Sequence, residues 1–241
     1  MEAIKTINLT KKYKDIVAVD SLNLKIDKGE LFSLLGVNGA GKTTTIKMLS
    51  CITTKTSGKA YINNIDISEY TNEVKKIIAV SPQETAIAHN LTVKENLKFI
   101  CGIYNFSKQK TEIKINEISE NLKLLSVLNK KAGKLSGGYM RRLSIAMALI
   151  SEPEVLFLDE PTLGLDVLAR YDLWDVIKSL KGKITIILTT HYMEEAEELS
   201  DRIGIMKDGK MLSVGTVDEL KNKAGKQKFE EAFVSIVKGE F

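Results

Sequence analysis

This sequence of 241 residues has few cysteines, no long hydrophobic run and no large excess of charge of one sign. The two cysteines, Cys51 and Cys101, have no CxxC spacing. They suggest neither a metal knuckle nor a redox motif, and we expect small buried residues in a reducing cytosol. The longest apolar stretches, such as 31–37 and 143–150, are far shorter than the roughly 20 residues that span a bilayer. The N-terminus predicts no signal peptide, so another chain is expected to supply any membrane-spanning part.

The charge balance is nearly even. Lys and Arg number 35, Asp and Glu number 31, and the formal net charge is +4. That excess is too small to argue for nucleic acid as a partner, although it is compatible with a position near an anionic membrane surface. Hydrophobic residues make up 44% and charged residues 27%, which excludes a disordered chain, a collagen and a small disulfide scaffold. A chain of this length can hold one or two domains without disulfides or metals.

Strand-like segments occupy the first third of the chain and recur later. Residues 3–9 and 22–26 alternate between apolar and polar, and 202–214 is typical of a hairpin that turns at Asp208-Gly209. Three further runs are nearly continuous and apolar, as in strands buried on both faces of a parallel sheet. These runs are residues 31–35, 155–158 and 184–188.

Helical signals dominate residues 84–135. Thr92 and Glu95 form a capping box at the start of a helix. Apolar residues then recur at helical spacing in two segments. The two sets are Val93, Leu97, Ile100 and Tyr104, and Ile115, Ile118, Leu122 and Leu125. With no internal repeat or long linker, the sequence predicts an α/β fold with a mostly parallel sheet, an N-terminal antiparallel β layer and an inserted helical subdomain.

A glycine-rich loop follows the apolar run 31–35. Residues 36–43 match G-x-x-x-x-G-K-[ST], and 44–50 can continue as a helix, as in P-loop nucleoside triphosphatases. Backbone N–H groups of such a loop approach phosphate oxygens, the lysine reaches the β- and γ-phosphates, and the hydroxyl after it ligates Mg²⁺. The predicted ATP-binding residues here are Gly36, Asn38, Gly39, Ala40, Gly41, Lys42, Thr43 and Thr44.

Two adjacent carboxylates directly follow the apolar run 155–158. Ligands of open α/β sheets sit at the carboxyl ends of the strands, so Asp159 and Glu160 are expected beside the phosphate loop. Because successive strand side chains point to opposite faces, we expect the two to act differently. Asp159 is predicted to hold the Mg²⁺ hydration shell, and Glu160 to polarise the attacking water as a general base.

The segment 135–139, Leu-Ser-Gly-Gly-Tyr, precedes a helix predicted over 140–150. Ser136, Gly137 and Gly138 at a helix start form a second anion site on the same chain. With the phosphate loop and acidic pair, this segment resembles the signature of the ATP-binding cassette (ABC) transporter nucleotide-binding subunits. The resemblance spans about residues 4–220 and implies a head-to-tail dimer, in which each ATP lies between one chain's phosphate loop and the other's signature.

Other positions match the family in order. The resemblance implies that Tyr13 stacks on adenine, that Gln83 senses the metal and γ-phosphate, and that Asp166 lies in a loop crossing the dimer interface. It makes His191 the switch histidine, catalytic together with Glu160 and Lys42. The implied Mg²⁺ ligands are Thr43, Gln83 and Asp159.

The signature departs from the family pattern at Tyr139, where glutamine is usual. The basic residues after it resemble those of the sodium and drug export branch.

Residues 1–220 are interpreted as the ATPase domain, with the helical insertion at about 84–150. Residues 221–241 are interpreted as an amphipathic helical extension. It either docks on its own domain or binds a partner, with its apolar face formed by Phe229, Phe233, Ile236 and Val237.

The sequence therefore predicts an ATP-hydrolysing subunit that drives a separate transmembrane permease, with export favoured, from the cytoplasmic face of the membrane. ATP and Mg²⁺ are the expected cofactors, and the working pair is a homodimer or a pair with a related subunit. A soluble ABC-type ATPase acting on ribosomes or nucleic acid is the alternative. A P-loop GTPase is disfavoured because 129–132, Asn-Lys-Lys-Ala, is not a guanine-reading motif, and a pure scaffold because every catalytic position is filled.

Overall fold

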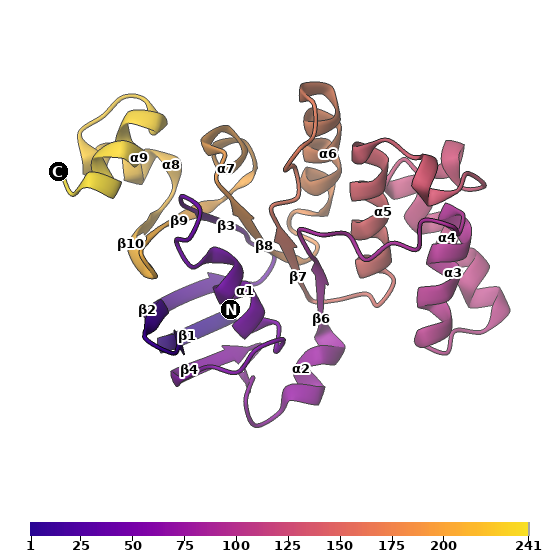
Figure 1. The fold of residues 1–241 in the computed structure, drawn as a ribbon, viewed down its shortest axis with the longest axis horizontal. Helices are drawn as coiled ribbons and strands as arrows, with labels where there is room; N and C mark the ends of the chain where they lie inside the picture. The colour runs from indigo at the N-terminus through magenta and orange to yellow at the C-terminus, as the bar shows by residue number, and fades with distance from the viewer. Residues whose placement is uncertain (241) are drawn as a thin grey trace.

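The computed structural model describes residues 1–240, which form two β-sheets with surrounding helices (Figure 1). The larger sheet has the strand order β10-β9-β3-β8-β7-β6. Its neighbours run parallel except for the β9–β10 hairpin, which confirms the predicted α/β class with a mostly parallel sheet. The strands are β3 (Leu31–Leu35), β6 (Ile78–Ser81), β7 (Val155–Asp159), β8 (Thr185–Thr190), β9 (Arg202–Lys207) and β10 (Lys210–Gly215).

The three predicted apolar runs form β3, β7 and β8, which are buried at every position. Successive residues alternate between two cores, because strand side chains point to opposite faces. Leu156 packs with residues of the helices α5 (Gly137–Leu149) and α6 (Val167–Leu180) on one face. Phe157 packs on the other face with residues of the second sheet. β6 was not predicted, because this short strand at the edge of the sheet shows no clear alternation of apolar and polar residues.

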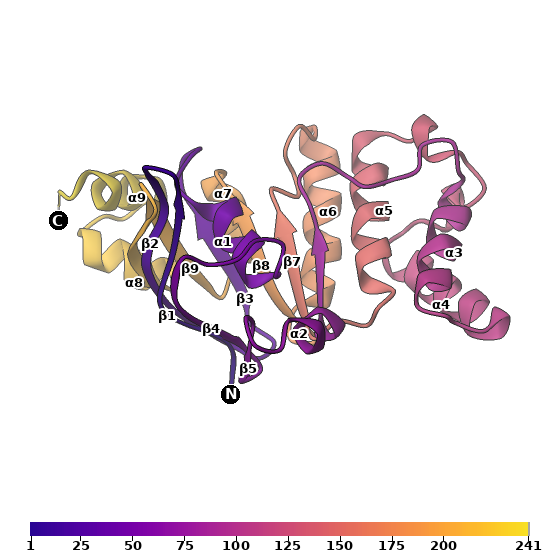
Figure 2. The same cartoon turned by 60° about the horizontal axis from the view of Figure 1, so that its bottom comes forward.

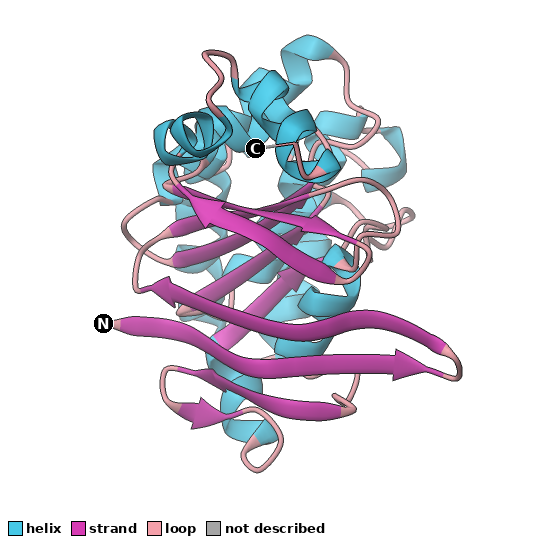
Figure 3. Ribbon diagram, turned by 90° about the vertical axis from the view of Figure 1, so that its left-hand side faces the viewer, coloured by secondary structure: helices cyan, strands magenta, loops and turns pink. Residues whose placement is uncertain are grey.

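The second sheet is the N-terminal antiparallel layer that the sequence predicts, with the order β2-β1-β4-β5. Figure 3 shows its long β1–β2 hairpin beside the larger sheet. The bounds are β1 (Glu2–Tyr13), β2 (Ile16–Asp27), β4 (Ser57–Ile62) and β5 (Ile65–Asp66), so the first two strands are longer than the predicted 3–9 and 22–26. Helix α1 (Lys42–Leu49) places Ile46, Met48 and Leu49 in the core between the two sheets.

The helical insertion lies at the opposite end of the molecule from the C-terminal helices (Figures 1 and 2). It contains α3 (Val93–Ile103), α4 (Lys108–Asn121), the short 3₁₀ turns Leu125–Val127 and Ala132–Lys134, and α5, and it follows α2 (Thr71–Ile77) and β6. The capping box at α3 is confirmed, with Glu95 N donating to Thr92 Oγ1 at 3.2 Å and Thr92 N donating to Glu95 Oε2 at 2.7 Å.

Three sequence expectations are corrected, two of them in this insertion and one just after α1. Tyr104 is exposed, because α3 ends before it, and Cys101 takes the buried position instead. Leu125 is exposed, because α4 ends at Asn121 and a 3₁₀ turn begins at Leu125. Cys51 is half-buried rather than buried. In each case the residue lies just past a helix end, where the helical period no longer sets its direction.

The C-terminal segment packs on its own chain. The β9–β10 hairpin turns at Asp208 and Gly209, both with positive φ (48° and 78°), as a type I′ turn requires. Helices α8 (Val217–Ala224) and α9 (Phe229–Lys238) then bury Phe229 and Ile236 against β9 and β10. The predicted division at residue 220 falls inside α8. Among the helices of residues 1–240, none is long and apolar enough to cross a bilayer.

Candidate active site

The glycine-rich loop joins β3 to α1 at the carboxyl edge of the larger sheet. A Cβ at Gly36 would lie 2.4 Å from the carbonyl oxygen of Met206, and one at Gly41 would lie 2.5 Å from that of Ala18. Gly41 also has φ of 101°, a conformation that favours glycine, and it caps α1. Neighbouring backbone thus packs closely against the loop at Gly36 and at Gly41, and a side chain at either position would push the loop away.

Lys42 is buried at the start of α1, and its ammonium group points back into the loop. Its Nζ donates to the carbonyl oxygens of Gly36 at 2.7 Å and Val37 at 3.2 Å. It also lies 3.4 Å from Glu160 Oε1. The two neutral carbonyl oxygens take two of the three N–H donors of the ammonium group, so one donor remains for an anion that enters the loop.

Asp159 and Glu160 both face this site, although strand alternation predicts opposite faces. β7 ends at Asp159, and Glu160 has φ of 48°, so the alternation stops between them. Asp159 Oδ1 accepts hydrogen bonds from Thr43 Oγ1 at 3.0 Å and Thr189 Oγ1 at 2.5 Å. Glu160 N donates to Thr189 Oγ1 at 3.0 Å, which holds its unusual backbone in place.

His191 follows β8 and reaches the same carboxylate. Its Nδ1 lies 2.8 Å from Glu160 Oε2, while the other carboxylate oxygen faces Lys42. The two residues come from neighbouring parallel strands, so the register of β7 and β8 sets this contact. The geometry leaves Glu160 buried, with Lys42 at one carboxylate oxygen and His191 at the other.

Lys42, Glu160 and His191 line one cleft of about 420 Å³ at the carboxyl edge of the sheet, and Asp159 lies outside its lining. Its walls include the loop residues 38–44, Gln83, Glu160 and His191, so four separated motifs meet there. Tyr13 is not in the lining. It is exposed at the end of β1, and Lys11 Nζ lies 4.8 Å from the centre of its ring. Ala18 of the adjacent strand β2 borders the cleft instead.

Arg141 is a buried residue of this region that sequence reasoning did not single out. From α5 it donates to the carbonyl oxygens of Pro82 at 2.9 Å and Gln83 at 3.0 Å. Burial lowers the pKa of the Arg141 guanidinium, while the nearby carboxylates of Asp159 and Glu195 act in the opposite direction. Arg141 thus ties the helix after the signature to the Gln83 segment. The only feature of the sequence that pointed to Arg141 was the pair of basic residues, Arg141 and Arg142, shortly after Tyr139.

The predicted signature lies outside the cleft that Lys42, Glu160 and His191 line. Ser136 caps α5 and is exposed with Gly137, and none of the three signature residues lines the cleft of Lys42. A Cβ at Gly138 would lie 3.0 Å from Ala169 Cβ, so this glycine permits the close approach of α5 and α6. Asp166 caps α6, accepting from Ala169 N at 2.9 Å.

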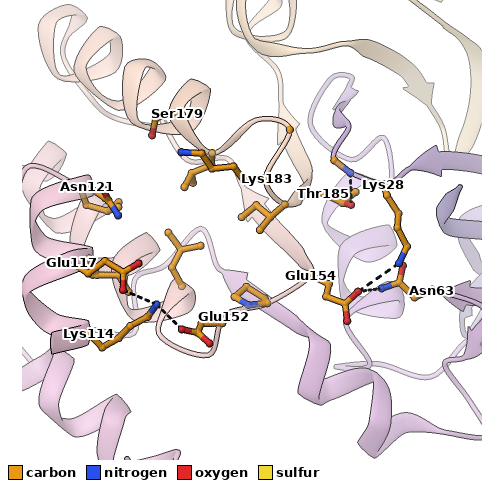
Figure 4. Close-up of a pocket in the computed structure, with 18 residues that line it drawn as sticks. Lys28, Asn63, Lys114, Glu117, Asn121, Glu152, Glu154, Ser179, Lys183 and Thr185 are labelled. Carbon is orange, nitrogen blue, oxygen red and sulfur yellow. Dashed lines mark hydrogen bonds and ion pairs between the residues drawn. The ribbon is translucent and has the colours of Figure 1, made fainter. Parts of the chain in front are cut away.

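A larger cleft of about 700 Å³ lies at the opposite, amino edge of the sheet (Figure 4). Glu154 and Thr185 border it near the starts of β7 and β8, and Lys114 and Glu117 border it from α4. It contains no glycine-rich loop and none of the predicted site residues, so the smaller cleft is the candidate for a nucleotide.

Lys114 connects the insertion to the core beside this larger cleft. Its Nζ donates to Glu152 Oε1 at 2.8 Å and to Glu117 Oε2 at 3.2 Å. The bond from Lys114 lowers the pKa of Glu152, so the contribution of this pair to stability is complete above the ordinary carboxyl pKa of 4.5. It is lost as the pH falls through the lower folded value.

We therefore expect Lys114→Met to lower the free energy of unfolding by about 1 kcal/mol at pH 7, since Glu152 is largely solvated. The difference from the wild type should vanish near pH 3. Urea unfolding at both pH values measures it, with Lys108→Met on the same helix as the control. An equal difference at both pH values would assign the loss to packing of the lysine stem instead.

The fold and the smaller cleft define a P-loop protein that binds a nucleoside triphosphate at the carboxyl edge of its sheet. The family model described as ABC transporter matches residues 19–163. The chain belongs to this family, as an ATP-binding cassette.

Curated relatives agree with this assignment. The chain is 38% identical over 240 residues to "Probable multidrug ABC transporter ATP-binding protein YbhF" of Escherichia coli, covering 97% of this chain but only 41% of that protein. It is 37% identical to "Daunorubicin resistance ATP-binding protein DrrA3" of Streptomyces coeruleorubidus, covering 92% of this chain and 71% of the relative. It is 42% identical to human "Phospholipid-transporting ATPase ABCA3", covering 88% of this chain and 12% of that protein.

Solved structures agree as well. An ATP-binding subunit of an ABC transporter superposes with a TM-score of 0.85 at 26% identity, over 97% of this chain and 99% of that one. A dimeric ATP-binding cassette in a post-hydrolysis state, bound to ADP and Pi, superposes with a TM-score of 0.79 at 29% identity, over 88% and 98% of the two chains. The predicted family and cassette fold are thus confirmed.

Proposed function

We propose that this chain binds and hydrolyses ATP and thereby powers a separate transmembrane permease. The observation that carries the proposal is the convergence of the phosphate loop, Gln83, Glu160 and His191 on one cleft. Each comes from a different connection after a parallel strand, as in open α/β sheets whose ligand lies at the carboxyl edge. The structure of a cassette bound to ADP and Pi supports hydrolysis at such a site.

ATP phosphates would lie on the loop from Gly36 to Thr44, in contact with its N–H groups and Lys42 Nζ. We propose that Tyr13, exposed at the end of β1, offers its ring face to adenine. Substitution of the ring would then weaken nucleotide binding without altering the phosphate contacts.

The donors beside the loop fit Mg²⁺. Thr43 Oγ1 and Asp159 Oδ1 lie 3.0 Å apart, and Gln83 lines the same cleft. These oxygens are hard ligands, and Mg²⁺ in phosphate sites takes one or two protein oxygens and keeps several waters. Within residues 1–240 there is no cluster of three or more His, Cys, Asp or Glu side chains suited to a metal. Bound Mg²⁺ would neutralise charge on the phosphates.

Glu160 is the proposed general base for the attacking water. Its carboxylate is buried, lies 2.8 Å from His191 Nδ1 and is oriented from its other side by Lys42. A base held in one orientation loses little entropy when the water is placed against it. His191 is proposed to keep this orientation and to contact the γ-phosphate.

A second copy would complete the site. The signature residues Ser136, Gly137 and Gly138 stand at the start of α5, away from the chain's own phosphate loop. Beside Asp166, Val167 and Leu168 are exposed by 61% and 80%. An apolar surface next to an unused anion site fits a head-to-tail interface. The dimeric cassette among the similar structures supports this arrangement. The pair is a homodimer or includes a related subunit.

A groove between the core and the helical insertion suits the permease. It has a volume of about 370 Å³ and includes Pro82, Ile100, Ile103, Tyr104 and Met147. Ile103 and Tyr104 are exposed by 59% and 46% and border the groove side by side, as in an apolar patch that binds a partner. The groove adjoins the Gln83 segment, so a cytoplasmic helix of the permease lying there would reach the nucleotide site through Gln83.

Export is the proposed direction, supported by the multidrug and daunorubicin-resistance proteins among the relatives. The chain would act peripherally at the cytoplasmic face of the membrane. The same names argue against the soluble alternative with a ribosome or nucleic acid as partner. We propose residues 1–220 as the ATPase domain, with the insertion at 84–150, and 221–241 as an extension that stabilises it.

The test is a mild-detergent pull-down of the tagged chain from its own membranes. We expect a polytopic membrane protein in stoichiometric amount, and we expect Ile103→Asp to lose it because a charge enters the apolar groove. Ile113→Asp is the matched control, since Ile113 is equally exposed on α4 but lies outside the groove. Recovery of a ribosome or a nucleic-acid enzyme would move the assignment to the soluble alternative.

A further inference from the structure

Helix α7 (Met193–Leu199) buries a carboxyl group that the proposed reaction does not use. Glu195 is 0% exposed. Its Oε1 accepts a hydrogen bond from Trp174 Nε1 at 3.1 Å, and its Oε2 is buried without a hydrogen-bond partner. Glu195 forms no ion pair with a cation of residues 1–240, although its charge acts at longer range on the buried guanidinium of Arg141. A carboxyl group so fully buried and unpaired is rare, because an ionised one is costly to desolvate.

The surroundings of Glu195 favour its neutral form. Burial raises the pKa of Glu195, while the nearby polar groups of Thr190, Thr162 and Trp174 act in the opposite direction without outweighing it. The hydroxyl oxygen of Thr162 is likewise buried without another partner. A protonated carboxyl group has one O–H donor and one free acceptor oxygen, which suits an indole N–H on one side and a hydroxyl on the other.

Glu195 lies where the two proposed catalytic segments meet. Thr190 is the last residue of β8 and directly precedes His191. Thr162 lies in the turn after Glu160, where Leu163 N donates to Glu160 O at 3.2 Å. The carboxyl group therefore lies near the strand end that carries the histidine and the turn that carries the proposed base.

Helix α6 holds the same segment at a second point. Arg170 lies one turn before Trp174 on α6, and its guanidinium is 4.7 Å from the centre of the Tyr192 ring. The Tyr192 ring is in turn 4.1 Å from the His191 ring. Asp166 of the proposed interface loop caps α6, so the segment after β8 packs against the helix that follows this loop.

We propose that Glu195 is a positioning residue, whose buried carboxyl group joins Trp174 and Thr162 so that His191 stays in hydrogen-bond contact with Glu160. It touches neither substrate nor reacting atoms, and it acts through the placement of His191. The proposal concerns the geometry of the free chain, and its consequence for turnover rests on the proposed ATP hydrolysis.

The first test observes His191 directly. The chain has only two histidines and one tryptophan, so imidazole NMR signals are readily assigned with a His89→Gln variant, and fluorescence reports on Trp174 alone. We expect Glu195→Ala in the full chain to shift the His191 Cε1–H signal and the Trp174 emission and to leave the His89 signal in place. Glu195→Gln, a neutral side chain of the same shape, should restore the wild-type His191 signal.

The second test measures turnover. With ATP as substrate, Glu195→Ala should lower kcat by about 10²-fold with KM changed less than about 2-fold, because displacement of a catalytic group affects the chemical step rather than binding. Glu195→Gln should recover most of kcat. An inactive wild type would refute the proposed hydrolysis, yet the NMR test would still decide the role of Glu195.

Two outcomes would overturn the proposal. One is a lowered Tm in Glu195→Ala with an unmoved His191 signal, which would make Glu195 part of the packing only. The other is an equal His191 shift in the alanine and glutamine variants, which would require an ionised carboxylate. If Glu195→Ala fails to fold, Trp174→Phe removes the N–H donor while keeping a smaller aromatic side chain, and the same His191 shift is expected from it.

Discussion

Replacement of Glu160 by glutamine is expected to lower ATP turnover by about 10³-fold while ATP still binds, since a positioned general base contributes roughly 10²–10⁴-fold. The amide has the shape of the carboxylate and can stay between His191 and Lys42, but it cannot accept a proton from water. Binding groups of the loop are untouched. Because hydrolysis reopens the proposed dimer, the variant should also accumulate as an ATP-bound pair.

Steady-state turnover and size-exclusion chromatography with ATP and Mg²⁺ measure both effects. Glu154→Gln is the matched control, because Glu154 is a carboxylate just before the same strand but borders the cleft at the opposite edge. It should leave turnover and association unchanged. Normal turnover by Glu160→Gln would refute the assignment of the base.

Replacement of Lys42 by alanine should weaken nucleotide binding strongly and abolish turnover. In the structure Lys42 Nζ is held by the carbonyl oxygens of Gly36 and Val37 and by Glu160. Its loss removes charge-assisted hydrogen bonds to phosphate, worth about 1.5–3 kcal/mol, which corresponds to a roughly 10- to 100-fold weaker affinity. Glu160 also loses one of the two groups that orient it, so turnover should fall further than affinity.

Titration with a fluorescent ATP analogue, followed by a turnover assay, separates these two losses. Lys47→Ala is the control, since Lys47 is an exposed lysine of the same helix α1. It should bind and hydrolyse ATP like the wild type. An unchanged affinity in Lys42→Ala would contradict the role proposed for the phosphate loop.

Much of the fold followed from local patterns. The apolar runs of β3, β7 and β8 were recognisable because strands buried on both faces need no polar side chains. β6, β4 and β5 were not recognised, since short strands with mixed burial have no measurable period. The ends of α3 and α4 were misjudged at Tyr104 and Leu125, because hydrophobicity continues where the helix stops.

The candidate site also has a part that the sequence predicts and a part that only the structure shows. The phosphate loop is contiguous in the sequence, so its spacing alone predicts its chemistry. Arg141 and Glu195 went unrecognised because a charged residue within a helix is usually solvated, and only burial marks it out. The opposed directions expected for Asp159 and Glu160 did not hold, since the positive φ of Glu160 breaks the alternation.

The sequence by itself determined the family, the phosphate loop and the strands that carry the acidic pair and the histidine. These depend on short-range spacing, which the chain keeps whatever its neighbours are. The tertiary structure decided that Glu160 lies between Lys42 and His191, that Arg141 holds the Gln83 segment and that Ser136 lies outside its own chain's cleft. These contacts depend on β8 standing between β3 and β7, and strand order arises from the packing of the whole core rather than from any local pattern.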